Sequence, residues 1–218
     1  MLVFDSLETG PLMTNCYIVG DSESKQAAVV DPGGHVGAIR SALDVLGLTC
    51  KFIINTHAHF DHVGGNGELK KATGAKILIH EAEASWLGQL TQHAKMFGVH
   101  VENSPPADGK LEEGQVLKLG NEKDSVRIKV HHTPGHSPGS VSLVVEGEKK
   151  ILVGDLVFAG SIGRTDLPGG DFDTLIDSVK SKIFNYSDDT KLYSGHGPET
   201  SIGREKRSNP FLTGRYRI

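Results

Sequence analysis

Short apolar-rich runs occupy the N-terminal part of the chain, and turns that contain glycine or proline separate them. The runs cover residues 2–7, 15–19 and 27–31, and the turns contain Gly10-Pro11, Gly20-Asp21 and Pro32-Gly33-Gly34. Runs of this length that are bounded by such turns predict β-strands. Residues 36–46 instead place Ile39, Leu43 and Leu46 three or four positions apart, which predicts an amphipathic helix.

The remaining chain repeats this alternation of strands and helices. Strands are predicted at 51–55, 75–80, 116–119, 126–131, 141–145, 151–153 and 191–193, and helices at 68–72, 81–90, 172–183 and near the C-terminus. Residues 91–109 include Pro105-Pro106 and predict an irregular, mobile loop. This order of elements predicts an α+β fold, with two sheets and helices packed outside them, in a single domain over residues 1–218.

Composition limits the classes of partner. The formal net charge is −4 and no long basic stripe is present, so we expect no nucleic-acid partner. A basic cluster near the C-terminus allows two interpretations, a solvated tail or a contact for an anionic substrate. It consists of Arg204, Lys206, Arg207, Arg215 and Arg217. The pattern contains no interface signal from which an oligomeric state could be predicted.

The chain also lacks the sequence features of membrane insertion and secretion. No apolar run approaches the length of a bilayer span, and acidic residues Asp5 and Glu8 stand where a secretory signal would be basic and then apolar. We therefore expect a cytoplasmic protein with no membrane partner. Cys16 and Cys50 have no disulfide or metal-site spacing, so they are expected to be buried free thiols.

A histidine-rich loop carries the strongest chemical signal. The sequence Thr56-His57-Ala58-His59-Phe60-Asp61-His62 directly follows the apolar residues 52–54. Neutral imidazole and ionised carboxylate are preferred ligands of zinc and similar divalent ions, and their alternation lets them converge on two adjacent centres. The loop therefore predicts a binuclear metal site, and the alternative is a polar surface turn that is rich in histidine.

Three further places join a strand end to a glycine- or proline-containing turn. They are residues 133–139 with His136, residues 153–155 with Asp155, and residues 193–198 with His196. Glycine allows the backbone to pass close to a metal cluster, and strand ends hold ligands rigidly. Each place alone also fits a structural, hydrogen-bonded residue.

Together with the histidine loop, these places resemble the metallo-β-lactamase superfamily in order and spacing over nearly the whole chain. The resemblance implies a four-layer αββα sandwich with metals at the sheet edges. It implies that His57, His59 and His136 bind one metal, that Asp61, His62 and His196 bind a second, and that Asp155 bridges them. Asp31 is similar to an early aspartate of the superfamily, which implies a structural or supporting role.

Within this superfamily, residues 160–166 and 197–211 resemble the compact glyoxalase II-like proteins. β-Lactamases commonly carry cysteine at the position of Asp155, and flavodiiron proteins carry glutamate at the position of His59, so this sequence resembles neither of these two groups. The resemblance implies hydrolysis of S-D-lactoylglutathione or a related hydroxyacyl thioester, a small-molecule substrate. It implies two divalent ions, with zinc expected and iron or manganese as alternatives, and catalytic roles for Asp61 and Asp155.

Substrate recognition departs from the longer glyoxalase II enzymes, because their helical C-terminal extension, which contacts glutathione, has no counterpart after His196. Loop residues must then bind an anionic substrate. Arg164 is the first candidate, since a guanidinium can bind a carboxylate through two hydrogen bonds. The alternative is an ion pair between Arg164 and Asp166 or another acid.

Two other functions fit the same residues. Persulfide dioxygenases share the fold and a related Gly-Arg-Thr-Asp stretch, and they use one iron on residues that correspond to His57, His136 and Asp155. The weaker alternative is a metal-stabilised binding module without catalysis. Structural metal sites close their coordination with protein ligands, whereas ligands spread over four loops leave room for solvent.

Overall fold

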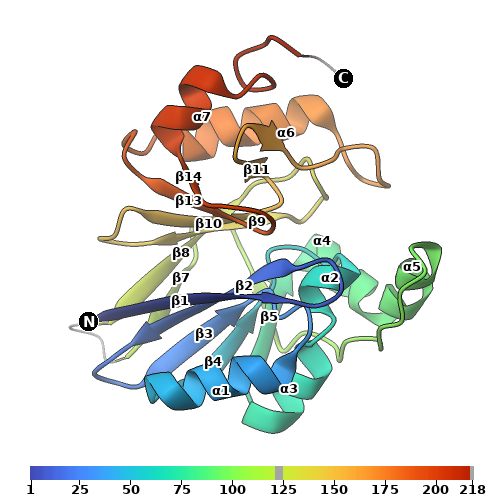
Figure 1. Ribbon diagram of the computed structural model, residues 1–218, viewed down its shortest axis with the longest axis vertical. Helices are drawn as coiled ribbons and strands as arrows, with labels where there is room; N and C mark the ends of the chain where they lie inside the picture. The colour runs from blue at the N-terminus through green and yellow to red at the C-terminus, as the bar shows by residue number, and fades with distance from the viewer. Residues whose placement is uncertain (121–124, 217–218) are drawn as a thin grey trace. The chain divides into compact units, whose positions relative to one another are not determined.

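The computed structural model describes residues 1–120 and 125–216, and its first sheet has six strands. Their order is β1-β2-β3-β4-β5-β6 (Figure 1), with bounds β1 Leu2–Thr9, β2 Thr14–Asp21, β3 Gln26–Val30, β4 Thr49–Ile54, β5 Lys76–His80 and β6 Gly109–Leu111. The first three strands pair antiparallel, and β3 to β6 pair parallel. The carboxyl ends of β3, β4 and β5 therefore meet at one edge of the sheet.

The second sheet also has six strands, in the order β14-β13-β10-β9-β8-β7. Their bounds are β7 Val116–Leu119, β8 Val126–His132, β9 Val141–Val145, β10 Lys150–Gly154, β13 Lys191–Ser194 and β14 Thr200–Ser201. Strands β8, β9 and β10 pair antiparallel, whereas β10 pairs parallel with β13. A separate hairpin joins β11 (Val157–Phe158) to β12 (Ser161–Ile162).

Helices cover one face of each sheet (Figure 1). In the first sheet, α1 (Val36–Leu46) and α3 (Asn66–Thr73) bury their apolar faces against β2, β3, β4 and β5. In the second, α6 (Phe172–Ser178), a π-helical turn η2 (Val179–Ile183) and α7 (Ile202–Ser208) pack on β9, β10 and β13. Burial of these apolar side chains stabilises each layer pair.

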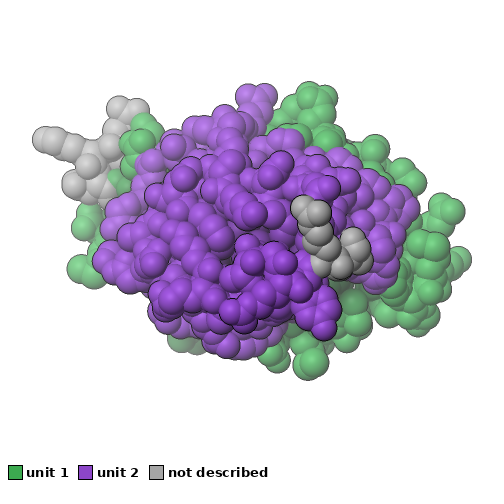
Figure 2. Space-filling view, turned by 90° about the horizontal axis from the view of Figure 1, so that it is seen from above, with its two compact units in different colours: residues 1–111, 117–127 green, residues 112–116, 128–218 purple. Residues whose placement is uncertain are grey.

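The chain divides into two compact units (Figure 2), residues 1–111 with 117–127 and residues 112–116 with 128–218. Each unit has its own cluster of buried apolar side chains. The assignment of a single domain to residues 1–218 stays a prediction. Arg217, one of the five C-terminal basic residues, lies outside the described residues.

Most longer elements agree with the sequence prediction, and α1 has the predicted bounds. This helix buries Val36, Ile39 and Leu43, and Gly47 ends it in the left-handed conformation with φ of 64°. The predicted helix over 172–183 is continuous, but its second half is a π-helix, in which the Phe184 amide donates to the carbonyl of Val179.

The region after β5 differs from the prediction. A single helix over 81–90 is wrong, because the structure has α4 (Glu81–Ala84), a 3₁₀ helix η1 (Ser85–Gln89) and α5 (Leu90–Met96). The irregular loop predicted from residue 91 is therefore also wrong as far as Met96. Burial of Leu87, Leu90 and Ala94 against the histidine loop determines these turns, and the local sequence period does not show it. The remaining missed elements, β6, β11, β12, β14 and α2 (Phe60–Val63), have four residues or fewer.

Cys16 and Cys50 are buried free thiols, as predicted, and burial raises the pKa of Cys50 to about 12.

Within residues 1–120 and 125–216, none of the helices has both the length and the apolar character that a bilayer crossing requires.

Candidate metal centre

The histidine loop begins at the carboxyl end of β4, beside the end of β3. Asp31 follows β3 in the left-handed conformation, with φ of 52°. Its Oδ1 accepts a hydrogen bond from the Thr56 amide at 2.8 Å, and its Oδ2 accepts one from Thr56 Oγ1 at 2.6 Å. The buried Asp31 carboxylate therefore fixes the first residue of the loop, which is a supporting role of the kind that the sequence predicts.

The same carboxylate orients the imidazoles. His62 Nδ1 lies 3.0 Å from Asp31 Oδ2, and because an ionised carboxylate only accepts, Nδ1 carries a proton. His57 Nδ1 lies 3.0 Å from Thr56 Oγ1, whose own proton points to Asp31, so His57 Nδ1 donates as well. Both rings then keep the lone pair on Nε2, where it is available to bind a metal.

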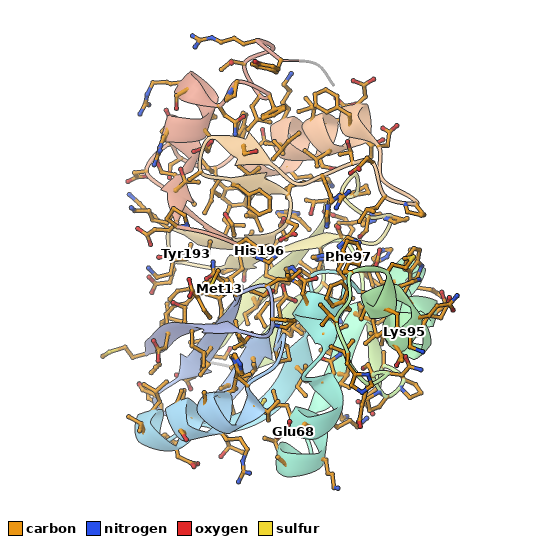
Figure 3. All side chains as sticks on the ribbon, turned by 45° about the vertical axis from the view of Figure 1, so that its right-hand side comes forward. Met13, Glu68, Lys95, Phe97, Tyr193 and His196 are labelled. Atoms are coloured by element: carbon orange, nitrogen blue, oxygen red, sulfur yellow. The ribbon has the colours of Figure 1, made fainter. Side chains whose placement is uncertain are left out.

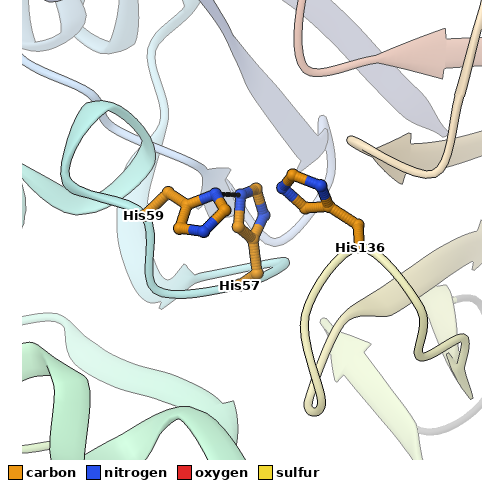
Figure 4. A group of neighbouring side chains, drawn as sticks. All are labelled: His57, His59 and His136. Atoms are coloured by element: carbon orange, nitrogen blue, oxygen red, sulfur yellow. Dashed lines mark hydrogen bonds between the residues drawn. The ribbon is translucent and has the colours of Figure 1, made fainter. Parts of the chain in front are cut away.

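Two pairs of possible metal-binding atoms lie close together within this unit. His59 Nδ1 donates a hydrogen bond to His57 Nε2 at 3.0 Å, which Figure 4 shows as a dashed line between the two rings. Two nitrogens on one tetrahedral zinc, at about 2.0–2.1 Å from it, would lie about 3.3 Å apart. His62 Nε2 lies 3.6 Å from Asp61 Oδ2, which also accepts a hydrogen bond from Thr14 Oγ1 at 3.1 Å.

A buried glutamate supports the backbone of the histidine loop, and it is a functional residue that the sequence did not predict. Glu83, on α4, is 2% exposed, and its Oε2 accepts the amide hydrogen of Ala58 at 3.0 Å. This bond fixes the backbone between His57 and His59. In the sequence, Glu83 follows Glu81 in a segment that is typical of a solvated helix face, so the pattern contains no signal for its role.

The second unit holds three predicted ligands of its own. His136 lies in the loop between β8 and β9 (Figure 4), and its Nδ1 donates to the carbonyl oxygen of Arg164 at 2.7 Å. The His136 Nε2 lone pair then lies 3.7 Å from Asp155 Oδ2. His196 follows β13 (Figure 3), and its Nε2 lies 3.7 Å from the same oxygen. One carboxylate oxygen therefore faces two imidazoles.

The donor atoms fit divalent metal ions. In each unit an imidazole lone pair faces a carboxylate oxygen, at 3.6 Å between His62 and Asp61 and at 3.7 Å between His136 and Asp155. Both atoms are electron-rich, and with the proton on Nδ1 neither donates a hydrogen bond to the other. A cation bound by both atoms would remove their repulsion, and nitrogen with carboxylate oxygen suits zinc, iron and manganese.

Arg164 forms an ion pair with Asp166, which is the alternative to substrate binding that the sequence allows. Its Nε and Nη2 both donate to Asp166, each at 2.7 Å, and the two side chains are 51% and 66% exposed. The hydrogen bond from Arg164 lowers the pKa of Asp166 to about 2. An exposed pair of this kind contributes little to stability and can exchange partners, so a substrate role for Arg164 stays a prediction.

We expect Arg164→Ala to raise the KM of an anionic thioester roughly tenfold or more and to leave a neutral thioester unaffected, because a charged hydrogen bond is lost. Steady-state kinetics with both substrates measure this. Asp166→Asn is the matched control, since it removes the pair but keeps the guanidinium, and its KM should not rise. Equal kinetics of Arg164→Ala and the unaltered protein on the anionic substrate would remove Arg164 from the substrate site.

His131 and His132 precede the loop of His136 and are therefore both candidates to orient a metal ligand, but the structure gives His131 another role. Its Nδ1 lies 3.1 Å from Glu113 Oε1 and its Nε2 lies 2.8 Å from Tyr186 Oη. Glu113 also accepts hydrogen bonds from the His132 amide at 2.7 Å and from Lys182 Nζ at 3.1 Å. Partial burial raises the pKa of Glu113, but the hydrogen bonds from His131, His132 and Lys182 lower it to about 2.

This cluster predicts a pH dependence of stability. The folded-state pKa of Glu113 is below its ordinary value of 4.5, so its contribution is complete above pH 4.5 and is lost as the pH falls toward 2. Glu113→Gln should lower the urea midpoint at pH 6, and the difference from the unaltered protein should shrink by pH 3. Urea unfolding at both pH values measures this, and a difference that is equal at the two values would contradict it.

Comparison with known proteins identifies the family. The family model described as the metallo-β-lactamase superfamily matches residues 9–196. The chain belongs to the metallo-β-lactamase superfamily. Hydroxyacylglutathione hydrolase GloC from Haemophilus influenzae, a relative, is 38% identical over 200 residues, which are 91% of this chain and 92% of GloC.

Two solved structures of the superfamily are also similar. The crystal structure of the B3 metallo-β-lactamase BLEG-1 has a TM-score of 0.88 and 39% identity, covering 97% of this chain and 100% of BLEG-1. The crystal structure of TTHA1623 in a di-iron-bound form has a TM-score of 0.86 and 35% identity, covering 95% and 100%. The predicted α+β metallo-β-lactamase fold is confirmed, and the chain is a hydrolase of this superfamily with a histidine and aspartate set able to bind metals.

Proposed function

We propose that the protein is a metal-dependent thioester hydrolase of the glyoxalase II type, which acts on S-D-lactoylglutathione or a related hydroxyacyl thioester. One observation carries the proposal: in each unit one imidazole, His62 or His136, has its Nδ1 bound to a protein acceptor and presents its Nε2 lone pair to a carboxylate. The similarity to GloC, whose name specifies hydroxyacylglutathione, supports this substrate class.

We also propose that the predicted ligands act together on two divalent ions. His57, His59 and His136 are assigned to one ion, Asp61, His62 and His196 to the other, and Asp155 to both. The di-iron form of TTHA1623 supports a count of two. Zinc is the expected metal, with iron or manganese as alternatives, because imidazole and carboxylate suit all three.

Bound metals would polarise the thioester carbonyl and lower the pKa of water toward about 7. The chain's own residues then have three tasks. Asp61, whose Oδ2 is held by Thr14, orients the attacking water by accepting its hydrogen bond. Asp155 supplies negative charge beside His136 and His196, which would offset the positive charge of the bound ions. Asp31 and the carbonyl of Arg164 hold protons on Nδ1 of His62 and His136, so neither ring donates at Nε2.

Thiol release from S-D-lactoylglutathione by metal-replete protein tests the proposal, with a chelated sample of the same preparation as the control. We expect turnover with kcat in the ordinary enzyme range of about 1–1000 s⁻¹ and its loss on chelation. Readdition of zinc, iron or manganese to the chelated sample identifies the ions that restore it. Turnover that survives complete metal removal would contradict a metal-dependent mechanism.

A β-lactam substrate is the second candidate, because BLEG-1 is described as a B3 metallo-β-lactamase and is 39% identical. Hydrolysis of a chromogenic cephalosporin by the same preparation measures it. If no thioester is cleaved, oxygen uptake with glutathione persulfide tests the dioxygenase. Metal-dependent melting without turnover of any of these substrates would support the non-enzymatic binding module.

A further inference from the structure

The hairpin of β11 and β12, with the residues that follow it, contacts two predicted ligands of the second unit. The carbonyl of Arg164 accepts the Nδ1 proton of His136 at 2.7 Å. Gly163 lies so close to Asp155 that a Cβ atom there would stand 1.7 Å from the Asp155 carbonyl oxygen and 3.1 Å from His136 Nδ1. The position of residues 160–164 therefore determines how His136 and Asp155 are held.

Two buried side chains of the C-terminal segment hold the other end of this hairpin. Glu205, on α7, is 0% exposed, and its Oε2 accepts the amide hydrogen of Gly160 at 3.0 Å. Asn209, also 0% exposed, donates through Nδ2 to the Ser161 carbonyl and to Glu205 Oε2, each at 2.8 Å. Thr200 Oγ1 donates to Glu205 Oε1 at 2.5 Å. These bonds form a closed network, which we call the Glu205–Asn209 clasp.

The N-terminus of α7 does not need the hydrogen bonds of the clasp for its capping. The N-cap of α7 is already supplied by Ser201, whose side chain accepts from the Arg204 amide. A fully buried carboxylate costs free energy unless its hydrogen bonds are satisfied, and here three donors satisfy it. The clasp binds the hairpin at two backbone groups: Glu205 accepts from the Gly160 amide, and Asn209 donates to the Ser161 carbonyl.

We propose that Glu205 and Asn209 are positioning residues: they fix the β11–β12 hairpin so that the Arg164 carbonyl holds His136 in its ligand tautomer, and they thereby set the affinity of the metal that His136 binds. The inference rests on the metal centre proposed above. Neither side chain touches a predicted ligand, so the effect passes through the hairpin backbone. Acceptors that orient metal-bound histidines contribute about 10–100-fold to metal affinity, and the clasp acts on such an acceptor.

Metal affinity and ring tautomer test this without reference to turnover. Glu205→Gln and Asn209→Ala are titrated with zinc against a chromophoric chelator, and the His136 ring is followed by long-range ¹H–¹⁵N NMR of the metal-free protein. We expect zinc affinity at one of two sites to fall about 10–100-fold, and the Nδ1-protonated signal of His136 to weaken. Thr190→Val is the matched control: Thr190 is 3% exposed and its hydroxyl bonds Ser187, away from the hairpin.

Thr190→Val should lower the melting temperature and leave zinc affinity unchanged. Unchanged affinity and tautomer in both clasp variants would overturn the proposal, as would an equal loss of affinity in Thr190→Val. If neither clasp variant folds, hydrogen exchange at the Gly160 amide of the unaltered protein decides, because coupling between two sites is reciprocal. If the proposal is correct, zinc binding must slow hydrogen exchange at the Gly160 amide. An unchanged exchange rate would reject the role of the clasp in metal binding. Zinc binding without thioester turnover would reject only the proposed function.

Discussion

Asp155→Asn is expected to release both metal ions and to lower thioester turnover by a factor well above 100. Asp155 Oδ2 lies 3.7 Å from both His136 Nε2 and His196 Nε2, so one oxygen serves two imidazoles of different assigned ions. The amide removes the negative charge that offsets two cations, and loss of an orienting partner alone already costs about 10–100-fold in affinity. Elemental analysis of metal per chain after dialysis, together with thiol release, measures both effects.

Asp166→Asn is the matched control for this substitution, since it removes a carboxylate that is 66% exposed and bonded to Arg164. It should retain the full metal content. Full metal content and activity in Asp155→Asn would refute the bridging assignment. Loss of one ion with the other retained would limit Asp155 to a single ion.

Gly33→Ala is expected to destabilise the fold by about 3 kcal/mol, the upper end of the usual cost of overpacking, because the added methyl group has no space. A Cβ at Gly33 would stand 2.0 Å from the carbonyl oxygen of Asp61 and 3.1 Å from Thr9 Oγ1. The obstacle is backbone and cannot change rotamer, so the loop that carries Asp61 must move. In a chain of this size the melting temperature should fall by roughly 6–12 °C, with loss of metal affinity. Thermal unfolding by circular dichroism and zinc titration measure the two effects.

Gly37→Ala is the control from the same region. Gly37 lies in α1 without a positive φ, and a methyl group added there would have no neighbouring atom within 4 Å. Alanine there should stabilise the helix by about 0.5–1 kcal/mol, since glycine is a poor helix former. A melting temperature of Gly33→Ala equal to that of Gly37→Ala would show that the loops yield to the extra group.

The sequence predicted the parts of the fold in which local pattern and burial agree. The helix over 36–46 could be predicted because its apolar residues recur every three or four positions and Gly47 ends it. The turns from Glu81 to Met96 could not, because packing of Leu87 and Leu90 under the histidine loop determines them. Very short strands such as β11 and β12 have too few residues to show a period.

The predicted ligands stand out in the sequence because histidines and aspartates at strand ends carry their chemistry in their residue type. Their assignment to particular ions remains a prediction. The residues that orient them could not be predicted, since Glu83 and Glu205 are charged members of polar helical segments, and only tertiary packing makes them 2% and 0% exposed. The Arg164 carbonyl is a backbone atom, which any residue type could supply, so no sequence pattern indicates its bond to His136.

Because both cysteines are buried, the protein itself should give no background signal in the thiol-release assay. Released thiols are commonly counted with an aromatic disulfide reagent, which reacts with thiolate. Cys50 is 4% exposed, and with a pKa of about 12 it holds almost no thiolate at neutral pH, while Cys16 is 0% exposed. The folded protein should therefore contribute no colour of its own, and the absorbance in each time course counts product molecules directly. A slow rise in a blank without substrate would in turn report unfolding of the first unit.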